Sequence, residues 1–167
     1  RFLWSADGHA PPEIPGVALP AENLAGWWNK LSLFRDDITD VGSHMLYFDL
    51  DVVITGSIDP LLFYDSDFAI IDNPYTPSFN SSIMRFKTGA RPDIWTDFSE
   101  KIAKRLPGDQ DWLAIKVPDA DLWPEGWCVL FRLHATQSVP QAARAVCFSW
   151  RPNPDDYPAG WIKDFWH

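Results

Sequence analysis

Two aspartates one residue apart, Asp49 and Asp51, stand within the mostly apolar segment "MLYFDLDVVI" at 45–54. Such a segment predicts a strand that runs to and past the acidic pair. Because alternate side chains of a strand share a face, both carboxylates should project together. Two like charges this close repel, and a hard cation such as Mg²⁺ or Mn²⁺ neutralises them with the oxygen ligands it prefers. The pair therefore predicts a metal site able to bind a diphosphate, and a polar strand end with two solvated carboxylates is the alternative.

The elements around this pair predict an α/β fold, because strand-like and helix-like segments alternate along the chain. Further strands are expected at 1–7, 67–72, 81–86, 128–133 and 144–150. Helices are expected at 26–34, 58–62, 91–106, 109–117 and 159–167, the clearest being 91–106, where apolar residues recur every fourth position. We expect a single domain over residues 1–167.

Composition narrows the class of protein. The 167 residues carry a formal charge of −9, which argues against a nucleic-acid partner because such proteins need a basic face. No apolar run approaches the roughly 20 residues that cross a bilayer, so no transmembrane segment is expected. Cys128 and Cys147 are interpreted as buried thiols of a protein in a reducing, cytoplasmic compartment, with a disulfide left open. Ten Trp and eleven Phe predict an aromatic core, with a few rings available to line a sugar site.

Five segments resemble, in order, those of retaining glycosyltransferases of the GT-A fold, especially family 8 and its bacterial and phage-like relatives. The segment "LYFDLDVVITGSIDPLL" resembles the DxD motif, and "GWWNKLSLF" upstream resembles the helix that offers a basic residue to the donor. The later segments "FNSSIMRF", "GDQDWLA" and "VCFSWRPNPDDYPAGWIKDFW" resemble the family's FNxGxM, DQDxLN and closing segments. The resemblance covers roughly residues 1–166.

This resemblance implies a GT-A fold, with a mixed sheet flanked by helices. It also implies transfer of a hexose from a nucleotide-diphosphate sugar, most simply a UDP-sugar, with retention of anomeric configuration. The acceptor would be a saccharide, a lipid or a protein. The implied cofactor is Mn²⁺ or Mg²⁺ held by Asp49 and Asp51, which agrees with the metal expected from their spacing.

The resemblance also assigns roles to individual residues, each with a structural alternative. Lys30 would contact the donor phosphate or sugar, or else lie on a solvated helix face. Asn80 and Ser81 would bind sugar hydroxyls, or else cap the start of a strand. Asp109 would hold the transferred sugar and Gln110 would lie near its anomeric carbon, although an acid is also favoured at a helix N-terminus.

The sequence departs from the family pattern in two places. The closing segment has Cys147 and Ser149 where a metal-binding His is expected, Trp150 where a Gly is expected, and Arg151 as a substitute phosphate contact. In addition, the strand and helix that bind the nucleotide base in the family precede the strand that 1–7 resembles, so this chain is expected to lack the first strand-helix unit. Both departures predict weaker donor binding by the isolated chain.

Two other functions are compatible with the sequence. "YFDLDVVITGS" resembles the first motif of haloacid-dehalogenase-type phosphatases, with Asp49 as nucleophile and Asp51 as general acid or base. Against that hypothesis, Val52 replaces the Gly that normally follows, and the motif lies far from the start of the chain. The third possibility is a non-catalytic remnant of a transferase that binds carbohydrate.

Overall fold

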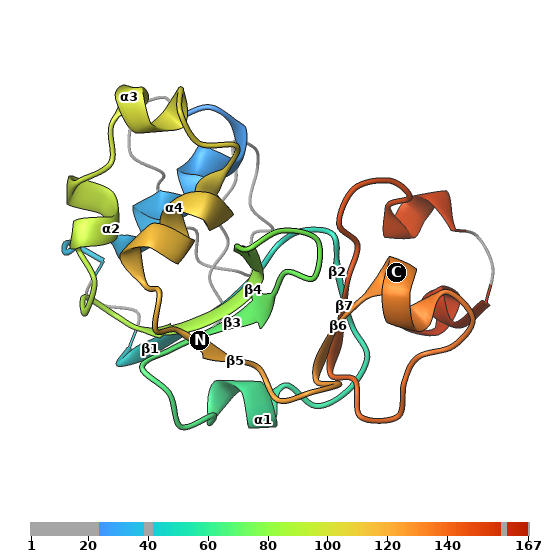
Figure 1. Ribbon diagram of the computed structural model, residues 1–167. Helices are drawn as coiled ribbons and strands as arrows, with labels where there is room; N and C mark the ends of the chain where they lie inside the picture. The colour runs from blue at the N-terminus through green and yellow to red at the C-terminus, as the bar shows by residue number, and fades with distance from the viewer. Residues whose placement is uncertain (1–23, 39–41, 158–159, 167) are drawn as a thin grey trace, which may run out of the picture.

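The computed structural model describes residues 24–38, 42–157 and 160–166 (Figure 1). The strands within these ranges are β1 (His44–Phe48), β2 (Val52–Ile54), β3 (Phe68–Asp72), β4 (Phe79–Lys87), β5 (Asp121–Leu122), β6 (Cys128–Leu130) and β7 (Ala145–Cys147). The α-helices are α1 (Asp59–Leu62), α2 (Asp93–Thr96), α3 (Glu100–Ala103) and α4 (Asp109–Lys116). Short 3-10 helices are η1 (Gly26–Phe34), η3 (Pro154–Asp156) and η4 (Gly160–Asp164), and η2 (Phe131–Ala135) is a π-helix. The strand expected at 1–7 lies outside the described residues.

The described strands form two mixed sheets. In the larger sheet, ordered β1-β4-β3-β5, β4 is antiparallel to both neighbours and β5 is parallel to β3. In the smaller sheet, ordered β2-β7-β6, β7 is antiparallel to β2 and parallel to β6. Helices α2, α3 and α4 cover one face of the larger sheet, whereas α1 lies on the other side (Figure 1). The predicted mixed α/β class is confirmed, with two sheets where one was expected.

The strand expected across 45–54 is broken at the acidic pair, so that prediction is wrong. The Asp49 N–H still donates to the carbonyl of Ser82 in β4, at 2.8 Å. The Asp51 carbonyl instead accepts a hydrogen bond from the N–H of Phe148, next to β7, at 3.1 Å. The chain thus leaves one sheet and enters the other between the two aspartates. Their proximity comes from this turn, and not from the side-chain alternation of a continuous strand.

The helix expected at 91–106 is also interrupted, forming α2 and α3. The interruption falls at Phe98, whose ring packs 4.9 Å from the ring of Trp28 and 6.3 Å from that of Trp112, measured between centroids. Ser99 then adopts extended backbone angles, with φ −153° and ψ 162°. The half-buried Phe98 ring thus makes its tertiary contacts at the point where the helix predicted from local periodicity is interrupted. The helices expected at 26–34 and 109–117 are confirmed as η1 and α4, the first of them as a 3-10 helix.

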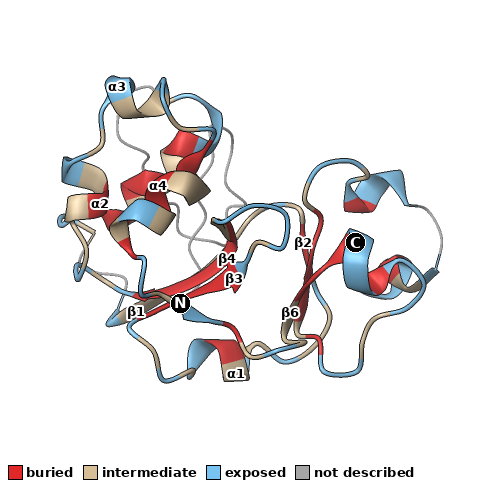
Figure 2. Cartoon of the chain, in the orientation of Figure 1, coloured by how far each residue is buried: buried red, intermediate tan, exposed pale blue. Residues whose placement is uncertain are grey.

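Buried side chains of the described residues form three core clusters, and Figure 2 shows β3 and β4 buried along most of their length. One cluster lies between the larger sheet and η1, α2 and α4. A second joins Ile71 and Ile83 of the larger sheet with Val52 and Cys147 of the smaller sheet. Because one cluster spans both sheets, the acidic turn between β1 and β2 is fixed from both sides. Among the described residues, no helix has both the length and the apolar character needed to cross a bilayer.

Candidate active site

Lys30 connects four segments of the chain at the acidic turn. Its Nζ donates to Asp49 Oδ2 at 3.0 Å, to Ser81 Oγ at 3.0 Å and to the Ser81 carbonyl at 3.3 Å. The same nitrogen lies 3.5 Å from Oδ2 of Asp109. Only 7% of the Lys30 side chain is exposed, so the alternative of a solvated helix face is wrong. One buried cation therefore compensates two carboxylates that come from distant parts of the sequence.

Tyr47 contacts both Asp49 and Lys30, and it was not among the site residues predicted from the sequence. Its hydroxyl donates to Asp49 Oδ1 at 2.5 Å, and Lys30 Nζ lies 5.3 Å from the centroid of its ring. Burial, together with the nearby Asp49 carboxylate, raises the pKa of Tyr47 far above its usual value, so the phenol stays a neutral donor. Tyr47 precedes Asp49 by two residues, and this spacing at the end of a strand is the signal that could have identified it.

Asp109 is buried at the first position of α4, 5% exposed, and accepts a hydrogen bond from Ser81 Oγ at 2.6 Å. Burial raises the pKa of Asp109, while the Lys30 charge and the Ser81 hydrogen bond oppose that shift. Asp109 is thus both an acid at a helix N-terminus and a member of the cluster. Gln110 follows it in α4 and is half-buried.

Asn80 links β4 to the closing segment. Its side-chain N–H donates to Ser149 Oγ at 2.9 Å, and its Oδ1 accepts from the Ser82 N–H at 3.0 Å. Asn80 and Ser81 are buried inside β4, which begins at Phe79, so neither of them caps the start of the strand.

The two positions considered for a third metal ligand, Cys147 and Ser149, lie beside Asn80. Cys147 Sγ is 3.8 Å from Asn80 Oδ1 and 3.6 Å from Ser149 Oγ. Burial raises the pKa of Cys147 to about 11, so it is a neutral thiol at pH 7 and a poor ligand for a hard cation. Cys128 and Cys147 are both free thiols, so the disulfide between them that the sequence allowed is not formed.

The acidic pair fits a hard cation in charge and in donor type. Burial raises the pKa of Asp51 from 3.8 to about 6, and the neighbouring Asp49 carboxylate contributes to the rise. A divalent cation would relieve both effects. Within residues 24–38, 42–157 and 160–166, no group of three His, Cys, Asp or Glu side chains could hold a metal. A cation here would therefore take Asp49 and Asp51 as its protein ligands and complete its coordination with substrate oxygens and water.

The raised pKa of Asp51 predicts a specific dependence of stability on pH. Below about pH 4 the carboxyl is protonated in both the folded and unfolded chains, and above about pH 6 it is ionised in both. Between these values the folded state holds the proton more tightly, so the free energy of unfolding falls as pH rises. After allowance for partial exposure, we expect Asp51 to account for a loss of about 2 kcal/mol. Urea unfolding in EDTA at pH 4 and pH 7 should show this loss in the wild type and a smaller one in Asp51→Asn; equal losses would contradict the assignment.

The closing segment departs from the family pattern in sequence but keeps a conformation suited to the Gly of that pattern. Trp150 adopts φ +69°, the left-handed region that favours glycine, and the family pattern has a Gly at this position. The next residue, Arg151, is exposed and lies 3.6 Å from Oδ2 of Asp156. The structure thus places Arg151 in a surface ion pair, and its phosphate contact stays a prediction.

The fold of this chain is similar to that of a solved glycosyltransferase. A crystal structure of the glycosyltransferase GlyE of Streptococcus pneumoniae TIGR4 aligns over 91% of this chain, with a TM-score of 0.64 and 13% identity. The apo form of GlyE aligns over 90%, with a TM-score of 0.61 and 14% identity. No protein-family profile and no curated protein sequence matches the chain. The alignments cover 46% and 45% of the GlyE chains, so this chain spans less than half the length of these proteins.

Proposed function

We propose that this chain contains the donor site of a glycosyltransferase of the GT-A type. The observation that supports it most directly is the cluster of Lys30, Asp49, Ser81 and Asp109, assembled from separate segments within a fold shared with glycosyltransferases. The donor would be a nucleotide-diphosphate hexose, most simply UDP-linked, transferred with retention to a saccharide, lipid or protein acceptor. The expected compartment is the reducing cytoplasm.

In this proposal, Asp49 and Asp51 hold Mn²⁺ or Mg²⁺, which would stabilise the charge that develops on the leaving diphosphate. Lys30 fixes the orientation of the Asp49 and Asp109 carboxylates through its hydrogen bond and close ion pair. Their remaining acceptor capacity is then available to ligand groups.

The sugar-binding part of the site would consist of Asn80, Ser81 and Asp109, with Gln110 at the reacting face. Asp109 is buried and held by both Ser81 and Lys30, so its carboxylate offers hydrogen-bond acceptors in a fixed position. Sugar hydroxyls are well matched to such an acceptor, because a hydrogen bond to an ionised group is about twice as strong as a neutral one.

The test is release of UDP from UDP-glucose and UDP-galactose by the purified protein, with MnCl₂ or EDTA. We expect metal-dependent release that is reduced at least 100-fold in Asp109→Asn and unchanged in Glu125→Gln, an exposed acid between β5 and β6. Stable labelling of Asp49 by beryllofluoride, with no consumption of nucleotide sugar, would instead support the phosphatase. Binding of a nucleotide sugar without turnover would support the non-catalytic remnant.

A further inference from the structure

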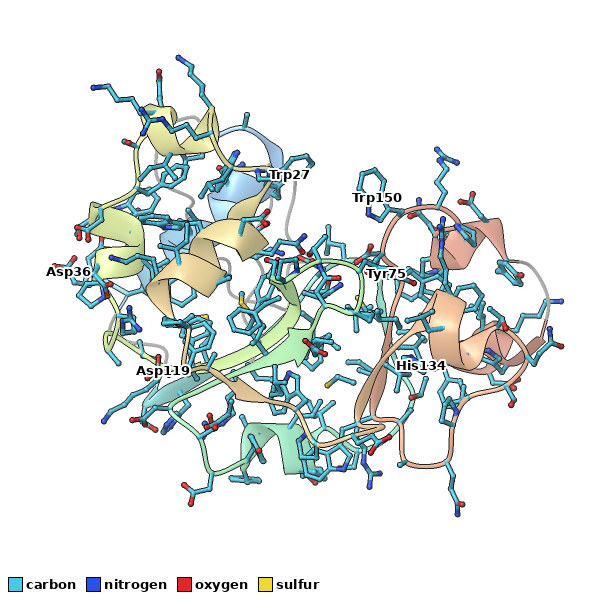
Figure 3. All side chains as sticks on the ribbon, viewed as in Figure 1. Trp27, Asp36, Tyr75, Asp119, His134 and Trp150 are labelled. Carbon is cyan, nitrogen blue, oxygen red and sulfur yellow. The ribbon has the colours of Figure 1, made fainter. Side chains whose placement is uncertain are left out.

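Two exposed tryptophans stand next to the candidate donor site. Trp27 in η1 is 58% exposed, and Trp150 after β7 is 85% exposed. Figure 3 labels Trp27 beside η1 and Trp150 beside the segment that follows β7, both in the upper half of the view. Exposed apolar side chains are common on protein surfaces, so it is the location of these two rings, on segments that border the candidate donor site, that suggests a function.

Trp27 lies next to Gly108, the residue before Asp109. Its indole Nε1 lies 3.6 Å from the point where a Cβ on Gly108 would stand. Gly108 immediately precedes Asp109, so the exposed indole lies beside the N-terminal end of α4 where Asp109 and Gln110 are placed. Trp27 therefore borders the site on the side of η1 and α4.

Trp150 belongs to the closing segment, which borders the site at Asn80. It follows Ser149, whose Oγ accepts a hydrogen bond from Asn80, the neighbour of Ser81. The left-handed φ of +69° is unfavourable for a bulky residue, and with 85% exposure the ring gains little packing in return. A costly backbone conformation that presents an exposed ring beside a site is a feature that points to binding.

We propose that Trp27 and Trp150 form the binding surface for a neutral oligosaccharide acceptor, an inference that rests on the proposed transferase function of the adjacent site. An exposed indole offers a flat apolar face that matches the C–H face of a hexose ring, and its N–H can donate to a hydroxyl. Two such rings, from two separate segments that border the site, suit a ligand of several sugar units. The net charge of −9 disfavours acidic glycans, which makes a neutral saccharide the better match.

In the transfer reaction, a hydroxyl oxygen of this saccharide would bond to the anomeric carbon of the donor sugar. The bond between that carbon and the diphosphate oxygen would break, its electron pair leaving with the diphosphate. The proton of the hydroxyl would pass to the departing diphosphate. The two rings take no part in these bond changes, because their role is to hold the saccharide in position.

The experiment uses an array of neutral oligosaccharides, including maltohexaose, cellohexaose and chitohexaose, with hyaluronan fragments as the acidic comparison. The tightest neutral binder is then titrated calorimetrically without donor. We expect Trp27→Ala and Trp150→Gly each to weaken binding about 5- to 20-fold. Trp150→Gly removes the ring while favouring the observed φ, so the fold should be retained, as urea unfolding would show. Phe63→Ala, which removes a 77% exposed ring after α1, should leave binding unchanged.

Four results would overturn the proposal: no neutral oligosaccharide binds, binding prefers the hyaluronan fragments, binding is insensitive to both tryptophan variants, or those variants alter only the oligomeric state measured by light scattering. The last result would mean that the rings contact a second copy of the chain. Release of UDP from UDP-glucose, assayed separately, distinguishes this failure from that of the proposed function. Tryptophan-dependent glycan binding without donor turnover would retain the saccharide site and reject the transferase.

Discussion

Replacing Lys30 by Met should lower the free energy of unfolding by about 3 kcal/mol at pH 7, because two carboxylates would lose their shared buried cation. The methionine side chain has a similar length and retains the packing, so the loss reports on charge. Urea denaturation measures the change. The matched control is Lys104→Met, whose lysine is 77% exposed and pairs with Glu100 on the surface, and we expect it to cost less than about 0.5 kcal/mol.

The double variant Lys30→Met with Asp109→Asn separates the ion pair from other effects of the substitution. If the buried Asp109 carboxylate is what becomes uncompensated, its neutralisation should restore part of the lost free energy, and the two changes should be strongly non-additive. A Lys30→Met protein as stable as the wild type, or strict additivity with Asp109→Asn, would contradict the role given to this lysine.

Asp51→Asn should abolish the stabilisation of the folded protein by UDP-sugar together with Mn²⁺. For the wild type, donor at 100 times its Kd should contribute about 2.7 kcal/mol, or roughly 5–10 °C in Tm for a chain of this length. The variant should show almost none of this shift, because the proposed cation loses one of its two protein ligands. Thermal unfolding with a panel of UDP-sugars, with and without MnCl₂, measures both quantities.

The stability of Asp51→Asn without ligand shows whether the variant is correctly folded. Without ligand at pH 7 it should be at least as stable as the wild type, because burial and the Asp49 charge disfavour the ionised Asp51 carboxylate. Asp119→Asn, an exposed substitution in the turn before β5, should keep the full ligand-induced shift. If the shift persists in Asp51→Asn, the metal is not held at this position.

The sequence by itself predicted the features that depend on short-range pattern. Helices at η1 and α4, the strands β3 and β4, and the mixed α/β class follow from the spacing of apolar residues over a few positions, and this spacing survives in the folded chain. The resemblance of five segments, in order, to the glycosyltransferase family also predicted four site residues that the structure brings together: Lys30, Asp49, Ser81 and Asp109. Their roles in donor binding stay predictions.

Only the tertiary structure decided the features that depend on distant partners. Asp49 and Asp51 hydrogen-bond to different sheets, and neither partner can be inferred from the residues next to them. The well-patterned helix is interrupted at Phe98, whose ring packs against Trp28 and Trp112, contacts that exist only after folding. The burial of Lys30 has the same origin, since three distant segments must close over one side chain. Local periodicity determines which elements can form, whereas long-range packing determines where they end and which charges meet.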